Sequence, residues 1–155
     1  MRPLLNSAMH TKNLFLIRDP RDQFVSLQQF NAKRGNRDLG KQENKSDQEF
    51  ARLLVKRNRR TMRELLDHEQ NNRNIHLRYE DIVLDTESEV RRLETFLDVE
   101  FDMAAIMQSS TKLDAHGTSR SPQDSIGRWK RLMSPEIKDI FKQEMSDELA
   151  TFGYD

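Results

Sequence analysis

The chain has 155 residues, 34% of them charged and 35% hydrophobic, and its 26 basic and 26 acidic side chains cancel. This length fits one domain over residues 1–155, since each half of a divided chain would have too small a core. A nucleic-acid-binding domain is usually basic, so the zero net charge argues against that class, and the absence of cysteine excludes disulfides and thiolate catalysis.

Other absences bear on localisation and metals. No apolar run approaches the roughly 20 residues of a membrane span, and the first residues lack the apolar stretch of a signal peptide. These patterns favour a cytoplasmic protein without a membrane partner. The four histidines lack metal-ligand spacing, so we expect no metal.

The first predicted elements are a strand and a helix. The apolar run over residues 13–17 predicts a buried strand of a parallel sheet. Asp19 as the cap and Pro20 at the first helical position predict a helix to about Ala32. The residues that this helix should bury are Phe24, Leu27 and Phe30.

Two helices and a strand are predicted next. Ser46 and Glu49 match a capping box, which predicts a helix to about Glu69 after an exposed loop. Residues 75–79 alternate in polarity and predict a second strand. A second capping-box pattern at residues 86–89 predicts a helix to about residue 98.

The last predicted helix begins at Ser134 and Pro135, after a polar loop over residues 108–128. The core residues expected from the last three helices are Phe50, Leu54, Met62, Leu65, Val90, Leu93, Leu97, Ile137, Ile140, Phe141, Met145 and Leu149. The order strand, helix, helix, strand implies parallel strands joined by a crossover, and therefore a helix-rich α/β fold.

The carboxyl end of the first strand is the strongest candidate site. Ligands of open α/β sheets bind at such ends, and the N-terminus of the following helix favours anions. The Arg18 guanidinium could hold a phosphate there, with the Ser26 hydroxyl beside it. A second interpretation fits equally well, in which Arg18 pairs with Asp19 and Ser26 is a small packing residue.

Four segments resemble motifs of the sulfotransferase family, in the family's order. Residues 16–26, LIRDPRDQFVS, are similar to its 3′-phosphate-binding motif, and residues 77–81 to its second-strand signature. Residues 86–98 resemble the helix that follows, and residues 125–130 the Gly-x-Trp-Lys loop near the C-terminus. The resemblance implies a P-loop nucleotide-binding-like fold, with helices flanking a parallel sheet. It also implies transfer of a sulfuryl group from 3′-phosphoadenosine 5′-phosphosulfate (PAPS) to a hydroxyl or amine of an unidentified acceptor.

The resemblance also implies a set of cofactor-binding residues. Arg18 and Ser26 would hold the 3′-phosphate of PAPS. Tyr79 stands where the family often contacts the adenine, although a core tyrosine at a strand end fits the same position. Ser125 and Arg128 resemble a variant of the C-terminal loop that closes over the nucleotide.

The C-terminal loop departs from the common family pattern. Pro122, Gln123 and Asp124 stand where the family commonly has Arg-Lys-Gly, and Arg120 could substitute for the missing cations. Trp129 is expected to anchor the loop.

The family's 5′-phosphosulfate loop and its catalytic base are expected before the 3′-phosphate motif. Nothing resembling that loop occurs in the 17 residues that precede Arg18. We therefore expect a domain truncated at its N-terminus, without sulfuryl transfer by the isolated chain and with no assignable catalytic residue. His10 and then Lys12 are the first candidates if transfer is found. The chain would be either part of an active enzyme or a non-catalytic relative that binds nucleotide.

A helical interaction module is the rival interpretation. Lys56, Arg59, Arg60 and Arg63 recur at helical spacing and form a basic face that could bind an acidic partner or remain solvated. Self-association is a further expectation, because a truncated sheet would expose a strand edge.

Overall fold

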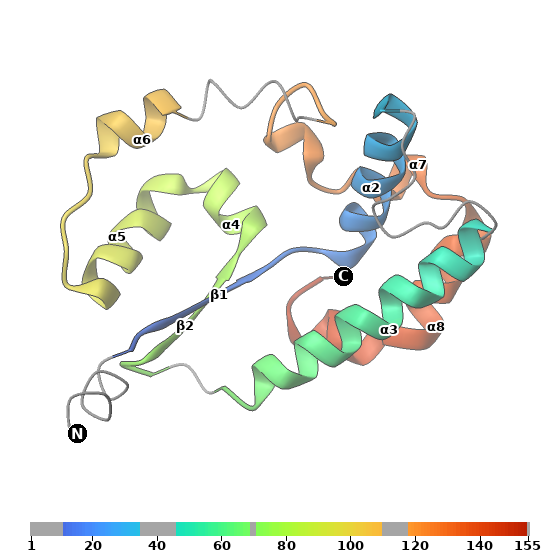
Figure 1. Cartoon of the computed structure of the whole chain (residues 1–155), viewed down its shortest axis with the longest axis horizontal. Coiled ribbons are helices and arrows are strands. Elements are labelled where there is room, and N and C mark those ends of the chain that lie inside the picture. Colours follow the sequence, from blue (N-terminus) through green and yellow to red (C-terminus); the bar gives the residue numbers. More distant parts are fainter. Residues whose placement is uncertain (1–10, 35–45, 69–70, 110–117, 155) are drawn as a thin grey trace, which may run out of the picture. The chain divides into compact units, whose positions relative to one another are not determined.

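The computed structural model describes residues 11–34, 46–68, 71–109 and 118–154 (Figure 1). These residues form two compact units. The sheet unit contains the described residues up to Ile17 and from Asp67 to residue 109, and the helical unit contains those of Arg18–Leu66 and residues 118–154. The expectation of a single domain over residues 1–155 stays a prediction.

The sheet unit is built on two parallel strands, β1 (Asn13–Ile17) and β2 (Asn74–Arg78), which lie side by side in Figure 1. Their register runs from Asn13 opposite Asn74 to Ile17 opposite Arg78. The sequence predicted the bounds of β1 correctly and placed β2 one residue too late. The expectation that β1 is buried is wrong for most of the strand, because Leu14 and Leu16 are exposed and only Ile17 is buried. The parallel pairing confirms the predicted α/β class, since such strands need a long connection.

Three helices follow β2: α4 (Tyr79–Leu84), α5 (Thr86–Leu97) and α6 (Met103–Ser109). The sequence predicted only α5. Helix α4 begins at the residue directly after β2, and Arg78 before it makes no side-chain capping hydrogen bond, so the sequence there lacks the usual signal of a helix start. Helix α5 is docked to the strands by Arg92, whose Nη2 donates to the His76 carbonyl at 2.7 Å.

The predicted capping box of α5 is wrong. Asp85 caps the helix, and its Oδ1 accepts a hydrogen bond from the Ser88 N–H at 3.1 Å. Thr86 instead donates its hydroxyl to the Ile82 carbonyl in the last turn of α4, at 2.7 Å. Because α4 ends directly before α5, the hydroxyl of Thr86 has a carbonyl within reach and the preceding aspartate takes the capping role.

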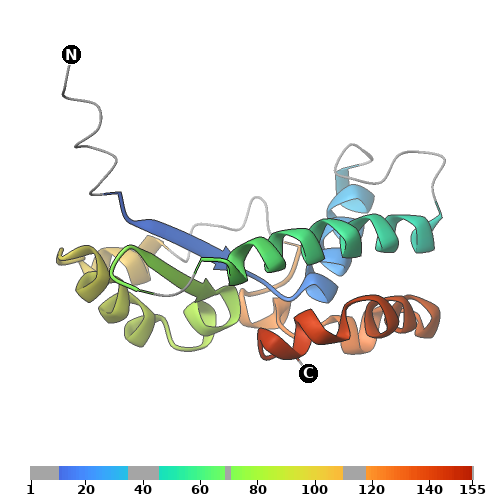
Figure 2. The same ribbon diagram turned by 90° about the horizontal axis from the view of Figure 1, so that it is seen from below.

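The helical unit contains α2 (Pro20–Arg34), α3 (Asp47–Leu66), a 3₁₀ turn η2 (Gln123–Ser125), α7 (Trp129–Leu132) and α8 (Pro135–Thr151). The long helices α3 and α8 lie along each other, as Figures 1 and 2 both show. Neither η2 nor α7 was predicted, because the polar residues around them resemble a loop.

Two of the predicted helix starts are confirmed by their hydrogen bonds. The Glu49 N–H donates to Ser46 Oγ at 3.2 Å, and the Ser46 N–H donates to Glu49 Oε2 at 2.7 Å, which completes the capping box of α3. At α8, Ser134 Oγ accepts from the Ile137 N–H at 3.5 Å, and Pro135 is the first helical residue.

Aromatic rings join α2, α3 and α8 in the core of the helical unit. Phe24 lies 5.4 Å from Phe50 and 6.0 Å from Phe141, measured between ring centroids. Every core residue that was predicted on α3 and α8 is buried. On α2, Phe24 is buried as predicted, but Leu27 and Phe30 are only half-buried.

The basic face of α3 partly faces α8. Arg59 Nε and Arg63 Nε donate to Glu148 Oε1 at 3.1 and 2.8 Å. Burial acts to raise the pKa of the Glu148 carboxyl, but hydrogen bonds from Arg59, the backbone and Arg63 outweigh it and hold the pKa below its usual value. Arg60 Nε also pairs with Glu64 Oε1, at 2.7 Å on the surface of α3. Three of the four basic residues proposed for an acidic partner therefore form ion pairs within the unit, and binding of such a partner stays a prediction.

In the described part of the chain, no helix combines the length and the apolar composition that crossing a bilayer requires.

Replacing Glu148 by Gln should lower the free energy of unfolding by about 1–2 kcal/mol, because two charge-assisted hydrogen bonds become neutral while both arginines stay partly solvated. Glu144→Gln is the matched control. Glu144 binds Arg52 at the surface at 3.3 Å, so its replacement should cost about 0.5 kcal/mol or less. Urea unfolding of both variants measures the difference.

The stability that Glu148 contributes should depend on pH, and the same pair of variants tests this. The folded pKa of Glu148 lies below the unfolded value, so its stabilisation is present above the unfolded pKa and is lost as the pH falls through the folded pKa. The stability gap between the parent chain and Glu148→Gln should narrow between about pH 5 and pH 2. A gap that stays constant over this range would contradict the ionised pairing.

Candidate functional site

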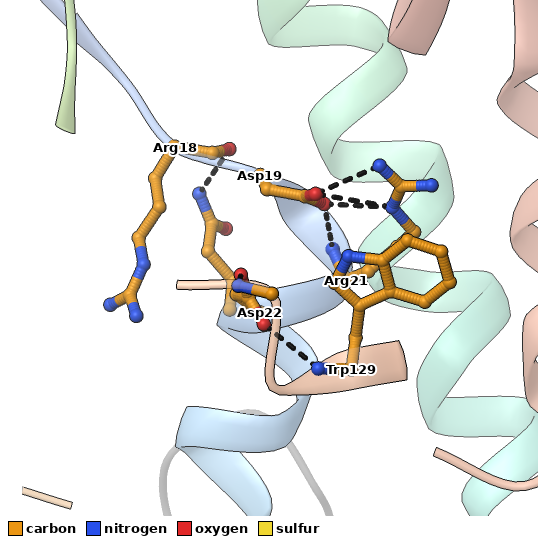
Figure 3. Close-up of polar contacts among 7 residues, drawn as sticks. Arg18, Asp19, Arg21, Asp22 and Trp129 are labelled. Carbon is orange, nitrogen blue, oxygen red and sulfur yellow. Dashed lines mark hydrogen bonds and ion pairs between the residues drawn. The ribbon is translucent and has the colours of Figure 1, made fainter. Parts of the chain in front are cut away.

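Helix α2 begins at a buried ion pair. The Asp19 carboxylate accepts a hydrogen bond from the Arg21 N–H at 2.8 Å, and it accepts two more from the Arg21 guanidinium, at 3.0 Å from Nε and 2.8 Å from Nη2. The guanidinium lies 3.8 Å from the centroid of the Trp129 ring, and Figure 3 shows Arg21 against this ring while the Arg18 side chain extends away from it. Asp19 therefore caps α2 as predicted, and it also holds Arg21 in a stacked position on Trp129.

Asp22 connects α2 to the segment that contains Trp129. Its carboxylate accepts hydrogen bonds from the backbone N–H groups of Gly127, at 2.6 Å, and Trp129, at 3.0 Å. The side chain is fully buried. Burial raises the pKa of the Asp22 carboxyl above its usual value, while the two backbone hydrogen bonds act in the opposite direction. The start of α2 thus fixes the path of the chain into α7.

Gly127 supplies the backbone conformation that this connection needs. Its φ is 69°, in the left-handed region that glycine adopts without a steric penalty. No atom lies within 4 Å of the position that a Cβ would take, so the requirement concerns the backbone angle and not space.

Further along α2, two polar side chains reach the same C-terminal segment. Ser26 Oγ lies 3.0 Å from Thr118 Oγ1. Gln29 Oε1 accepts a hydrogen bond from Arg128 Nη2, and Arg128 Nη1 donates to Thr118 Oγ1 at 3.5 Å. Arg128 is buried, and its burial together with the nearby cations Arg18 and Arg131 lowers its pKa, against the opposing effect of two carboxylates.

Asp22, Ser26 and Gln29, which make these contacts, form a polar stripe along α2 together with Lys33. The four residues are spaced by four, three and four positions, which places them on one face of a helix. Sequence reasoning found Ser26 but missed the roles of Asp22 and Gln29. The signal that could have revealed these roles is the helical spacing of the polar residues that follow Arg18 in the sequence.

The remaining predicted site residues divide between the two units. Arg18 Nη2 donates to the Ser125 carbonyl at 3.3 Å, while the Ser125 hydroxyl donates to the Pro122 carbonyl at 2.5 Å. Arg18, Ser26, Ser125 and Arg128 thus all belong to the contacts between α2, its preceding turn and residues 118–129. Tyr79 is the half-buried first residue of α4 in the sheet unit, and its part in a nucleotide site stays a prediction.

Comparison with known proteins identifies the family. The sequence profile of the sulfotransferase family matches residues 10–103, and the chain belongs to this family. Its fold is similar to that of mouse sulfotransferase SULT7A1 in a crystal structure complexed with PAP, with a TM-score of 0.62 and 16% sequence identity. This similarity covers 95% of the present chain and 61% of the mouse chain. A comparison with curated proteins gives no match.

These findings confirm the family resemblance and the P-loop-like α/β fold that it implied. At 16% identity the likeness to the mouse enzyme shows the fold alone. Among the described residues, no three His, Asp or Glu side chains gather in a way that could hold a metal ion. The expectation that the protein uses no metal stays a prediction.

Replacing Asp22 by Asn should destabilise the helical unit by about 1–3 kcal/mol, because the amide offers one acceptor oxygen to two buried N–H groups. Trp129 is the single tryptophan of the chain, so its fluorescence reports directly on the released segment. Asp124→Asn, at an exposed carboxylate nearby, is the control and should change neither the urea midpoint nor the emission. An Asp22→Asn variant that matches this control would show that the two hydrogen bonds contribute little.

Proposed function

We propose that the helical unit binds the 3′-phosphoadenosine part of PAPS, and that the complete protein transfers the sulfuryl group to a hydroxyl or amine acceptor. The observation that carries this proposal is the cluster at the start of α2. Arg18 and Ser26 contact one C-terminal segment there, residues 118–129, which contains Arg128 and which Asp22 fixes in place. Membership of the sulfotransferase family supports the same class of ligand.

The electrostatics of this cluster suit a phosphate. Arg18 and Arg128 lie near enough for Arg18 to lower the pKa of Arg128, so the two cations repel each other. A doubly charged 3′-phosphate near both would replace this repulsion by attraction. Guanidinium groups also present paired N–H donors that match phosphate oxygens, and a serine hydroxyl adds a further donor.

In this proposal the described residues bind and orient the donor. During transfer, the bond between the sulfuryl sulfur and the oxygen of the 5′-phosphate breaks, and the acceptor oxygen or nitrogen forms a bond to sulfur. The acceptor proton passes to a base, and 3′-phosphoadenosine 5′-phosphate (PAP) leaves. Holding the adenosine end lowers the entropic cost of aligning the sulfuryl group with the acceptor.

The proposal predicts that the chain distinguishes PAP from adenosine 5′-phosphate, which lacks the 3′-phosphate. Arg18→Ala should weaken PAP binding by about 10- to 100-fold, the equivalent of one charge-assisted hydrogen bond or two, and leave the weaker binding of adenosine 5′-phosphate unchanged. Ser26→Ala should have a smaller effect, of about three- to tenfold, because it removes a neutral hydroxyl. Isothermal titration calorimetry measures each affinity.

Arg52→Ala is the matched control, since Arg52 is an exposed arginine of α3 in the same unit. It should leave the affinity for PAP unchanged. Equal affinities of the parent chain for PAP and adenosine 5′-phosphate would refute a 3′-phosphate site.

A further inference from the structure

A second basic feature lies beside the proposed nucleotide site. An open pocket of about 810 Å³ extends along the C-terminal half of the polar stripe of α2. Four basic side chains line it, Lys33, Arg120, Arg128 and Arg131, together with a single carboxylate, Asp124. The ionised lining therefore carries a net charge of +3, in a chain whose total net charge is zero.

The cations of this pocket come from three different segments. Lys33 lies near the end of α2, Arg131 lies in α7, and Arg120 precedes η2. Arg120 and Arg131 are exposed, and in the described ranges no carboxylate forms an ion pair with either of them. Arg131 also contributes to the lowered pKa of Arg128, as expected where like charges are close together.

The pocket overlaps only slightly with the residues proposed to bind the 3′-phosphate. Arg128 belongs to both sets, whereas Arg18, Ser26 and Ser125 do not line the pocket. A volume of about 810 Å³ is larger than one phosphate group fills, and the lining charge of +3 exceeds the roughly two negative charges of a single phosphate.

We propose that this pocket binds a small polyanion that carries two or more phosphate or sulfate groups. Such a ligand can pair with Lys33, Arg120 and Arg131 together, and its charge offsets the excess of cations in the lining. The Thr118 hydroxyl, which also lines the pocket, is a hydrogen-bond donor for the same groups. Two sources offer this chemistry, a free polyphosphate and an acceptor that already carries sulfate groups.

The test uses the full chain and calorimetry with three probes: inorganic phosphate, tripolyphosphate and a disulfated disaccharide. Tripolyphosphate or the disaccharide should bind at least about tenfold more tightly than phosphate, with an affinity that falls as salt is added. Tighter binding of tripolyphosphate indicates a free polyphosphate as the ligand, and tighter binding of the disaccharide indicates a sulfated acceptor. If neither probe binds more tightly than phosphate, the proposal is wrong.

The double variant Lys33→Gln with Arg131→Gln should weaken binding of the preferred probe by about tenfold or more. Lys56→Gln with Arg57→Gln is the matched control, because it removes two exposed charges of α3 outside the pocket, and it should change the affinity less than twofold. Urea unfolding checks that both double variants fold. If a variant does not fold, the charge-reversed single variant Arg131→Glu serves instead.

Two further measurements separate this proposal from the proposed function. Arg18→Ala should weaken binding of PAP but change the affinity for the preferred polyanion probe less than about twofold. The double variant of Lys33 and Arg131 should weaken binding of the polyanion probe and leave the affinity for PAP unchanged. Loss of polyanion binding in Arg18→Ala would overturn the inference, because the probe would then occupy the nucleotide site. If the parent chain binds PAP but binds neither polyanion probe more tightly than phosphate, the nucleotide proposal stands and this inference is wrong.

Discussion

The arrangement of the helical unit depends on one buried carboxylate. Asp22 accepts hydrogen bonds from two backbone N–H groups that lie 105 and 107 residues further along the chain. A buried carboxylate needs such partners, and two N–H groups of an irregular segment need an acceptor. The carboxylate and the two N–H groups therefore satisfy each other's need for a hydrogen-bond partner. The segment that carries Ser125 and Arg128 is held beside the start of α2, and both proposed anion sites rest on this connection.

Much of the fold could be predicted because its signals are local. The apolar run of β1, the capping box at Ser46 and the Ser134-Pro135 start of α8 each lie within a few residues, and the structure confirms all three. The failures also have local causes. Helices α4 and α7 are too short for a periodic pattern, and the cap of α5 was misplaced because an upstream carbonyl captured the Thr86 hydroxyl.

The candidate site could be predicted only in part, since its residues are joined over long sequence distances. The family pattern indicated Arg18, Ser26 and Arg128, but it did not reveal that Gln29 is the hydrogen-bond partner of Arg128. Nor did it reveal that Asp19 binds Arg21, whose guanidinium stacks on Trp129. Single-sequence reasoning identifies the groups that carry charge, whereas the partners that orient them appear only once the chain is folded.

The geometry of Gly127 restricts what could replace it. A side chain there would meet no neighbouring atom within 4 Å, so bulk is tolerated, whereas φ of 69° disfavours any residue with a Cβ. Asparagine and aspartate adopt this conformation more readily than other residues, and β-branched residues least. The position therefore requires a residue that tolerates a left-handed backbone, whatever its size. Asn should be accepted there, although it is larger than Ala, which should not be.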